Sequence, residues 1–367
     1  MLPTARQPCY LSCVRVLVTG ATGFVGGALA HRLRALGHEL HALARASSDA
    51  QPLHAISAIV HAGDIGDPNT VTEAAAGCEV VYHCAGVSAL HAAPTALSWI
   101  NVAGTENVIA AARHAGVERV VLLSCADVSL CNRDRLHWKE DAVLGHAPLG
   151  TFARSKLLAE ELALHASDAA LCVTALRPAF LWGPGDRTNL PGLCAEGLRG
   201  GVRLHGGGDN LFATTYVDNL VEAMIAAATA PGVGGSAFHV ADADMLTARE
   251  FFEQLSAAVG LPAPRAEPYS LAYARAWLRR AQHRDGAWPE DVARRGRACL
   301  LDCLRAIRTL GYAPVASVEQ GMQALAAWAK RAGGPQALAG LGRRPASERD
   351  AAHHERLAGQ EPSNSER

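Results

Sequence analysis

Val14–Gly27, VRVLVTGATGFVGG, is the stretch that decides the fold of this chain. Its first residues form an apolar, β-branched run typical of a buried strand, and a helical apolar pattern follows. Between them lie Gly20, Gly23 and Gly26. One glycine allows a tight turn, one lets the backbone approach a pyrophosphate at the helix start, and one lets the helix pack closely. The spacing therefore predicts a dinucleotide-binding turn; the alternative is a purely structural strand-to-helix turn.

The following chain repeats this alternation of apolar strands and amphipathic helices. Strands joined by helices of about a dozen residues predict right-handed βαβ units and a doubly wound parallel sheet, with ligands at the carboxyl ends of the strands. The pattern places further strands at 39–43, 58–61, 79–84, 119–124 and 171–176.

Three motifs resemble one enzyme family, the extended short-chain dehydrogenases/reductases of the NAD-dependent epimerase/dehydratase superfamily. TGATGFVG at 19–26 is similar to the family's cofactor loop, and NVAGTENV at 101–108 to its N-V-x-G-T-x-N-V motif. RPAFLWGPGD at 177–186 resembles the branch of 3β-hydroxysteroid dehydrogenases and related bacterial reductases of long-chain β-keto compounds. The resemblance covers about 14–331 and implies a Rossmann-type sheet with a smaller, mostly helical C-terminal substrate lobe.

The turn and the resemblance together assign a cofactor site for NADP or NAD. Arg45 follows the second strand, where an acidic residue would bind the ribose 2′-hydroxyl of NAD. An arginine there favours the 2′-phosphate of NADP, although it could instead stack on adenine. The expected cofactor residues are Gly20, Thr22, Gly23, Phe24, Val25, Gly26, Arg45, Asp64, Ile65, Cys84, Ala85, Gly86, Lys156 and Pro178.

The catalytic motif departs from the family's pattern. The family carries Y-x-x-x-K on a helix, and its tyrosine delivers the proton that a developing alkoxide needs. Here Lys156 is present, but Phe152 stands where the tyrosine is expected. Cys125 takes the place of the usual serine or threonine, and Ser124 precedes it. The sequence thus matches the cofactor-binding motifs of the family but not its proton-transferring residues.

Three interpretations of this altered site remain. In the first, the protein reduces a ketone, or oxidises the corresponding alcohol, on a bulky apolar molecule such as a steroid, a long-chain β-keto lipid or a secondary metabolite. Its proton would come from Thr151, Ser124, a water held by Lys156, or an acidic group on the substrate. In the second, the protein binds nucleotide without turnover. In the third, Cys125 performs thiol or other non-redox chemistry.

Composition narrows the possible partners. The net charge of −1 gives no electrostatic argument for nucleic acid, and no apolar run is long enough to span a membrane. The ten cysteines lack Cys-x-x-Cys pairs, so we expect free thiols and no metal site in a cytoplasmic protein. By analogy with the family, a homodimer is expected.

The pattern also predicts four parts of the chain. These are an N-terminal extension (1–13), an NAD(P)-binding domain (14–243, of which part of 179–213 reaches into the substrate cleft), a substrate lobe (244–331) and a disordered tail (332–367). Apolar periodicity predicts helices in the substrate lobe at 251–259, 271–281, 300–310 and 318–330.

Overall fold

A computed structural model gives the structure of the protein and describes residues 13–87, 93–143, 145–282 and 286–341. The predictions for the N-terminal extension, apart from its last residue, and for the tail beyond 341 lie outside the described residues.

A seven-stranded parallel sheet organises the fold, as the sequence predicts. The strand order is β3-β2-β1-β4-β5-β7-β11, so the direction of winding reverses between β1 and β4. Ligands of doubly wound sheets bind in the crevice at this reversal, at the carboxyl ends of the strands. The strands are β1 (Arg15–Thr19), β2 (Glu39–Ala44), β3 (Ile59–Ala62), β4 (Val80–His83), β5 (Arg119–Leu123), β7 (Cys172–Pro178) and β11 (Ser236–Val240).

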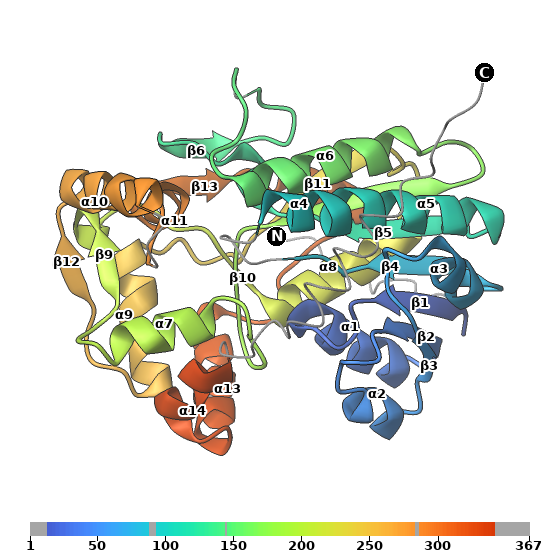
Figure 1. Ribbon diagram of the computed structural model, residues 1–367, viewed down its shortest axis with the longest axis horizontal. Helices are drawn as coiled ribbons and strands as arrows, with labels where there is room; N and C mark the ends of the chain where they lie inside the picture. Colours follow the sequence, from blue (N-terminus) through green and yellow to red (C-terminus); the bar gives the residue numbers. More distant parts are fainter. Residues whose placement is uncertain (1–12, 88–92, 144, 283–285, 342–367) are drawn as a thin grey trace, which may run out of the picture.

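Helices cover both faces of this sheet and bury an apolar core on each side (Figure 1). Successive side chains of a strand point to opposite faces, so Val16 and Val18 of β1 belong to one core and Leu17 to the other. One face carries α1 (Phe24–Ala35), α2 (Gln51–Ala55), α8 (Val217–Thr229) and α12 (Leu304–Leu310); the other carries α3 (Pro68–Ala75), α5 (Gly104–His114) and α6 (Thr151–His165). The short helix α4 (Pro94–Leu97) continues through a π-helical turn (Ser98–Ala103) into α5.

A second group of elements packs beside the carboxyl ends of the sheet, on the left in Figure 1. Its core contains an aromatic cluster that includes Phe180, Phe212, Phe251 and Phe252. The helices are α7 (Leu190–Gly197), α9 (Ala248–Val259), α10 (Tyr269–Ala281), α11 (Pro289–Gly296), α13 (Val318–Arg331) and α14 (Gly334–Leu341). Three parallel strand pairs complete it: β6 (Arg135–Trp138) with β13 (Cys299–Leu301), β8 (Phe180–Trp182) with β10 (Thr214–Tyr216), and β9 (Arg203–His205) with β12 (Arg265–Glu267).

Two expectations for the C-terminal part are wrong. The helix predicted at 300–310 begins only at Leu304, because residues 299–301 pair with β6 and the Asp302 carboxylate accepts a hydrogen bond from the Leu304 amide. The predicted disorder from 332 fails for α14, whose Leu338 is fully buried against the second group's core. The segment shows no apolar periodicity in the sequence, so its docking depends on contacts that only the tertiary structure provides.

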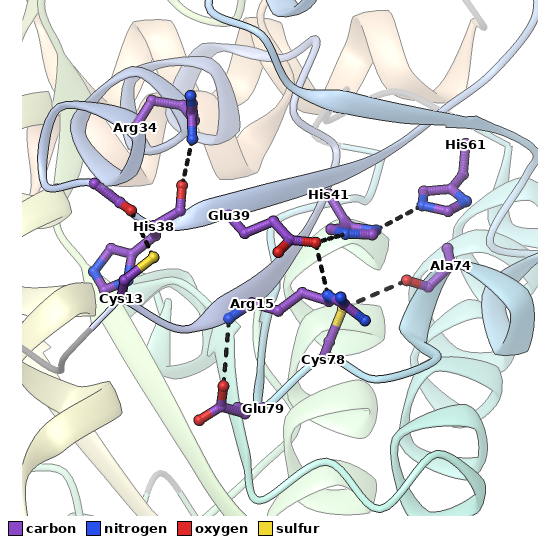
Figure 2. Close-up of polar contacts among 11 residues, drawn as sticks. Cys13, Arg15, Arg34, His38, Glu39, His41, His61, Ala74, Cys78 and Glu79 are labelled. Atoms are coloured by element: carbon purple, nitrogen blue, oxygen red, sulfur yellow. Dashed lines mark hydrogen bonds and ion pairs between the residues drawn. The ribbon is translucent and has the colours of Figure 1, made fainter.

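A chain of polar side-chain contacts links β1, β2 and β3 at the end of the sheet that lies opposite the carboxyl ends of the strands (Figure 2). The Arg15 guanidinium donates to Glu39, Glu39 contacts His41, and His41 is hydrogen-bonded to His61 at 2.8 Å. Arg15 opens β1 and Glu39 opens β2, so the two charges lie at the amino ends of the strands. The cluster therefore lies away from the carboxyl ends of the strands, where doubly wound sheets bind ligands.

Candidate active site

The glycine-rich turn after β1 has the close packing that a phosphate-binding turn requires. Gly20 adopts a left-handed φ of +69°, and a Cβ there would lie 2.7 Å from the amide nitrogen of Ala85. A Cβ on Gly26 would lie only 2.3 Å from the Gly20 carbonyl oxygen, so α1 can pack this closely only with glycine. Gly23, the residue before α1, has a single neighbour within 4 Å of such a Cβ. The turn thus leaves its backbone open where an anion would meet the helix start.

A cavity of about 380 Å³ opens from this turn toward the second group of elements. The carboxyl ends of β1, β4 and β5 line part of it, and Phe180, Leu181 and Phe212 form an apolar wall. Of the predicted site residues, this cavity is lined by Gly20, Gly23, Phe24, Val25, Gly26, Cys84, Ala85, Gly86, Ser124, Cys125, Phe152 and Lys156. The sequence therefore located residues from four separate segments that the fold brings together.

Lys156 and Phe152 reach the cavity from the first turns of α6, one helical turn apart. The Lys156 ammonium donates to the main-chain oxygen of Leu123 at 2.6 Å, which fixes it at the end of β5. Burial lowers the pKa of Lys156, against smaller raising effects of Cys125 and Glu160. Phe152 presents only an apolar ring, and its exposed fraction is 9%. The site can therefore hold a positive charge at Lys156 and release a proton from it. No tyrosine is among the described residues that line the cavity.

Ser124 and Cys125 follow β5 and both line the cavity. The Ser124 hydroxyl is buried and has no hydrogen-bond partner among the described residues, so it is free to bind a substrate oxygen. Burial, with a smaller contribution from the Asp127 carboxylate, raises the pKa of the Cys125 thiol to about 12. A thiol that stays protonated at neutral pH is a poor nucleophile, which argues against thiol chemistry at Cys125.

Buried polar side chains brace this wall of the cavity. The Asn101 amide binds both backbone groups of Val87 and donates to Ser155 of α6 at 3.0 Å. His83, at the end of β4, bridges Thr19 and Thr105 at 2.8 and 3.0 Å. The segment after β4 is thereby tied to β1, α5 and α6. These contacts explain Asn101 and Thr105 of the 101–108 motif.

Six predicted residues do not line the cavity. Thr151, the first residue of α6, does not line the cavity, so it is a poor candidate for the missing proton donor. Asp64 instead accepts a hydrogen bond from the Gly66 amide, and Arg45 is exposed just beyond β2. Both still lie at the carboxyl edge of the sheet, where an adenosine would extend. The full set is Thr22, Arg45, Asp64, Ile65, Thr151 and Pro178.

Four charged residues that the sequence did not indicate also line the cavity, namely Asp127, Arg135, Arg187 and Arg294. Asp127 follows the Ser124-Cys125 pair, and its carboxylate forms an ion pair with Arg294 of α11. Arg135, at the start of β6, is 4% exposed and donates to the Ala126 carbonyl and the Ser129 hydroxyl. The sequence could not have indicated Arg294, because α11 lies more than 150 residues after the strand that it faces.

The family follows from comparison with known proteins. Residues 16–241, which span the sheet and its glycine-rich turn, match the NAD dependent epimerase/dehydratase family. The chain belongs to this family. Its seven-stranded parallel sheet with flanking helices is a Rossmann-like fold.

Alignments with three named relatives cover most of this chain and most of each relative. A 2-alkyl-3-oxoalkanoate reductase of Stenotrophomonas maltophilia (strain K279a) is 34% identical over 86% of this chain and 99% of its own. A 4-hydroxy-2-methyl-3-oxo-4-farnesyl-3,4-dihydroquinoline-1-oxide ketoreductase of Stigmatella aurantiaca is 33% identical over 85% and 96%. A 3-beta-hydroxysteroid dehydrogenase of Mycolicibacterium neoaurum is 28% identical over 84% and 89%. These relatives confirm the resemblance to the 3β-hydroxysteroid dehydrogenase branch.

Solved structures agree with the fold. MoeE5 in complex with UDP-glucose and NAD superposes with a TM-score of 0.67 at 27% identity, over 87% of this chain and 99% of MoeE5. Among the residues that the structure describes, no helix is long and apolar enough to cross a membrane. Within the same residues, no group of three or more His, Cys, Asp or Glu side chains could hold a metal ion.

Proposed function

We propose that this protein is an NAD(P)-dependent oxidoreductase that reduces a ketone, or oxidises the corresponding alcohol, on a bulky apolar molecule. The observation that carries the proposal is one cavity lined by the glycine-rich turn, by Lys156 and Ser124, and by the apolar wall around Phe180 and Phe212. The ketoreductase and dehydrogenase names of the relatives support the same reaction class.

The cavity residues divide the work of this reaction. A bound nicotinamide nucleotide supplies the hydride, and the open backbone at Gly23 and the first turn of α1 hold its diphosphate. The Ser124 hydroxyl donates a hydrogen bond to the carbonyl oxygen of the substrate. Lys156 stabilises the negative charge that develops there, and its ammonium group supplies the proton through a water molecule. The lowered pKa of Lys156 makes that proton easier to release.

Phe152 gives this site a slower proton transfer than a tyrosine would. General acid–base catalysis by a positioned side chain contributes about 10²–10⁴-fold, so its loss slows a reaction without abolishing it. Substrates whose alkoxide is already stabilised, for example by conjugation, would depend less on a protein acid.

We also propose that NADP is the preferred cofactor. Arg45 is exposed at the end of β2, where the adenosine ribose binds in Rossmann folds. An arginine fork matches the geometry of a 2′-phosphate, and no acidic residue occupies the end of this strand.

The decisive experiment measures NADPH consumption by the purified protein against a panel of aliphatic and steroid ketones. We expect turnover, and we expect Lys156→Ala to reduce kcat/KM by at least about 100-fold. Lys330→Ala, at an exposed position of α13, is the matched control. Turnover that survives Lys156→Ala unchanged would remove the redox assignment. Tight NADPH binding with no turnover of any ketone would support the second candidate, a nucleotide-binding protein whose site has lost its acid.

A further inference from the structure

The cavity carries more positive charge than hydride transfer to a neutral ketone needs. Its lining contains four basic side chains (Arg135, Lys156, Arg187, Arg294) and one acidic side chain (Asp127). Lys156 has the role already described, and Arg187 is exposed at the rim. Arg135 and Arg294 remain, and both lie at the end of the cavity that holds Ser124 and Cys125.

Arg135 is a buried cation without an ion-pair partner among the described residues. Its contacts are the neutral Ala126 carbonyl at 3.1 Å and the Ser129 hydroxyl at 2.8 Å, and its Nε has no partner in the same residues. Taking a guanidinium out of water costs several kcal/mol unless an anion compensates it. A ligand anion in the cavity would provide that compensation.

Arg294 approaches the same place from the second group of elements. It pairs with Asp127, and its Nε likewise has no partner among the described residues. Asp127 and Arg294 line the same cavity as Ser124 and Cys125, so the pair lies near the expected position of the reacting carbonyl. Since Arg135 holds Ala126 and Arg294 holds Asp127, the two guanidinium groups flank the segment that directly follows Ser124 and Cys125.

We propose that Arg135 and Arg294 bind a substrate carboxylate next to the reacting carbonyl, so that the substrate is a 3-oxo acid (or the 3-hydroxy acid) with apolar substituents. Arginine is suited to this role because its donors match a carboxylate in pairs. The apolar wall at Phe180, Leu181 and Phe212 takes the alkyl part. This inference rests on the proposed function but makes a separate claim about charge, which binding can test without turnover.

The first test measures binding of a 2-alkylalkanoate and of its neutral amide, which contain no reacting carbonyl, by calorimetry in the presence of NADP. We expect the acid to bind at least about tenfold more tightly than the amide. Arg294→Gln should reduce this preference to about one, and Arg135→Gln should weaken it where the variant folds. Asp127→Asn should increase it, because a neighbouring negative charge is removed. Arg308→Gln, exposed on α12, is the control.

The double variant Asp127→Asn/Arg294→Gln separates binding by Arg294 from repulsion by an unmasked Asp127. If the preference for the acid stays lost in the double variant, the guanidinium itself binds the carboxylate. Equal binding of acid and amide to the native protein, or an unchanged preference in Arg294→Gln, overturns the inference.

The second test compares oxidation of a 2-alkyl-3-hydroxy acid with that of its methyl ester by NADP, since both compounds resist decarboxylation. We expect kcat/KM for the acid to exceed that for the ester by at least about tenfold. Equal turnover of both compounds refutes the carboxylate site while supporting the proposed oxidoreductase. Preferential binding of the acid without oxidation of either compound supports the carboxylate site and refutes the oxidoreductase.

Discussion

The ammonium nitrogen of Lys156 lies 2.6 Å from the main-chain oxygen of Leu123, the last residue of β5. This contact links the first turns of α6 to the strand that presents Ser124 and Cys125. It positions the Lys156 ammonium in the cavity lining one helical turn from Phe152.

Lys156→Arg tests whether Lys156 supplies a proton or only a charge. Arginine keeps the positive charge but does not deprotonate in proteins, so we expect NADPH binding within about threefold of the native value and kcat lower by about 10²-fold or more. The measurement is steady-state kinetics together with fluorescence titration of NADPH, with Lys330→Arg as control. Native-like kcat in Lys156→Arg would show that charge alone suffices.

Phe152→Tyr introduces the phenol that the family resemblance implies at this position. The side chain lines the cavity one turn from Lys156, so the new hydroxyl should act as a general acid and raise kcat for ketone reduction by at least about tenfold. Phe180→Tyr adds the same group on another element of the cavity lining and should not raise kcat. A folded Phe152→Tyr protein that gains activity on a generic hydroxysteroid would mark the native site as decayed. A fall in activity on the native substrate would instead mean that Phe152 shapes a specialised pocket.

Gly26→Ala should damage the nucleotide site. The added methyl group would lie 2.3 Å from the Gly20 carbonyl oxygen, so the turn must shift at a cost of about 1–3 kcal/mol. We expect NADPH affinity to fall by at least about tenfold in a calorimetric titration. Gly27→Ala is a matched control, because the nearest atom to its methyl group is 3.3 Å away. Equal affinity of the two variants would contradict the role given to the turn.

Arg45→Ala should change cofactor choice. A charge-assisted hydrogen bond contributes about 1.5–3 kcal/mol, so losing the contact to a 2′-phosphate should weaken NADPH binding by about 10–100-fold. NADH has no such phosphate and should bind as before. The exposed Arg133→Ala serves as control. A native protein that binds NADH more tightly than NADPH would refute the proposed preference.

The stability of the protein should fall as the pH falls below about 6.5. Burial lowers the pKa of His83 and of His239 to about 3, while the unfolded chain protonates each near 6.5. Between these values the unfolded state binds more protons, so the free energy of unfolding rises with pH by up to about 1.4 kcal/mol per pH unit for each histidine. Urea unfolding between pH 4 and 6 measures this slope. We expect His83→Gln to reduce it by one proton and the exposed His31→Gln to leave it unchanged. An unaltered slope in His83→Gln would mean that His83 does not drive the acid sensitivity.

Local sequence signals determined the fold and located the glycine-rich turn that lines the cavity. The glycines at 20, 23 and 26, the alternation of strands and helices, and the register of Lys156 on its helix are set by backbone sterics and by periodicity, which neighbouring residues express on their own. The helix predicted across 300–310 was wrong because local periodicity says nothing about a distant strand partner. Cys299–Leu301 forms a strand only because β6 lies beside it.

Only the tertiary structure decided which charged side chains line the cavity near Ser124 and Cys125. Arg294 meets Asp127 across 167 positions of the chain, and Arg135 becomes a buried cation because β6 packs under the segment that follows β5. An arginine in a sequence carries no mark of whether water or protein surrounds it. Its electrostatic role depends on desolvation and on distant neighbours, and folding alone supplies both.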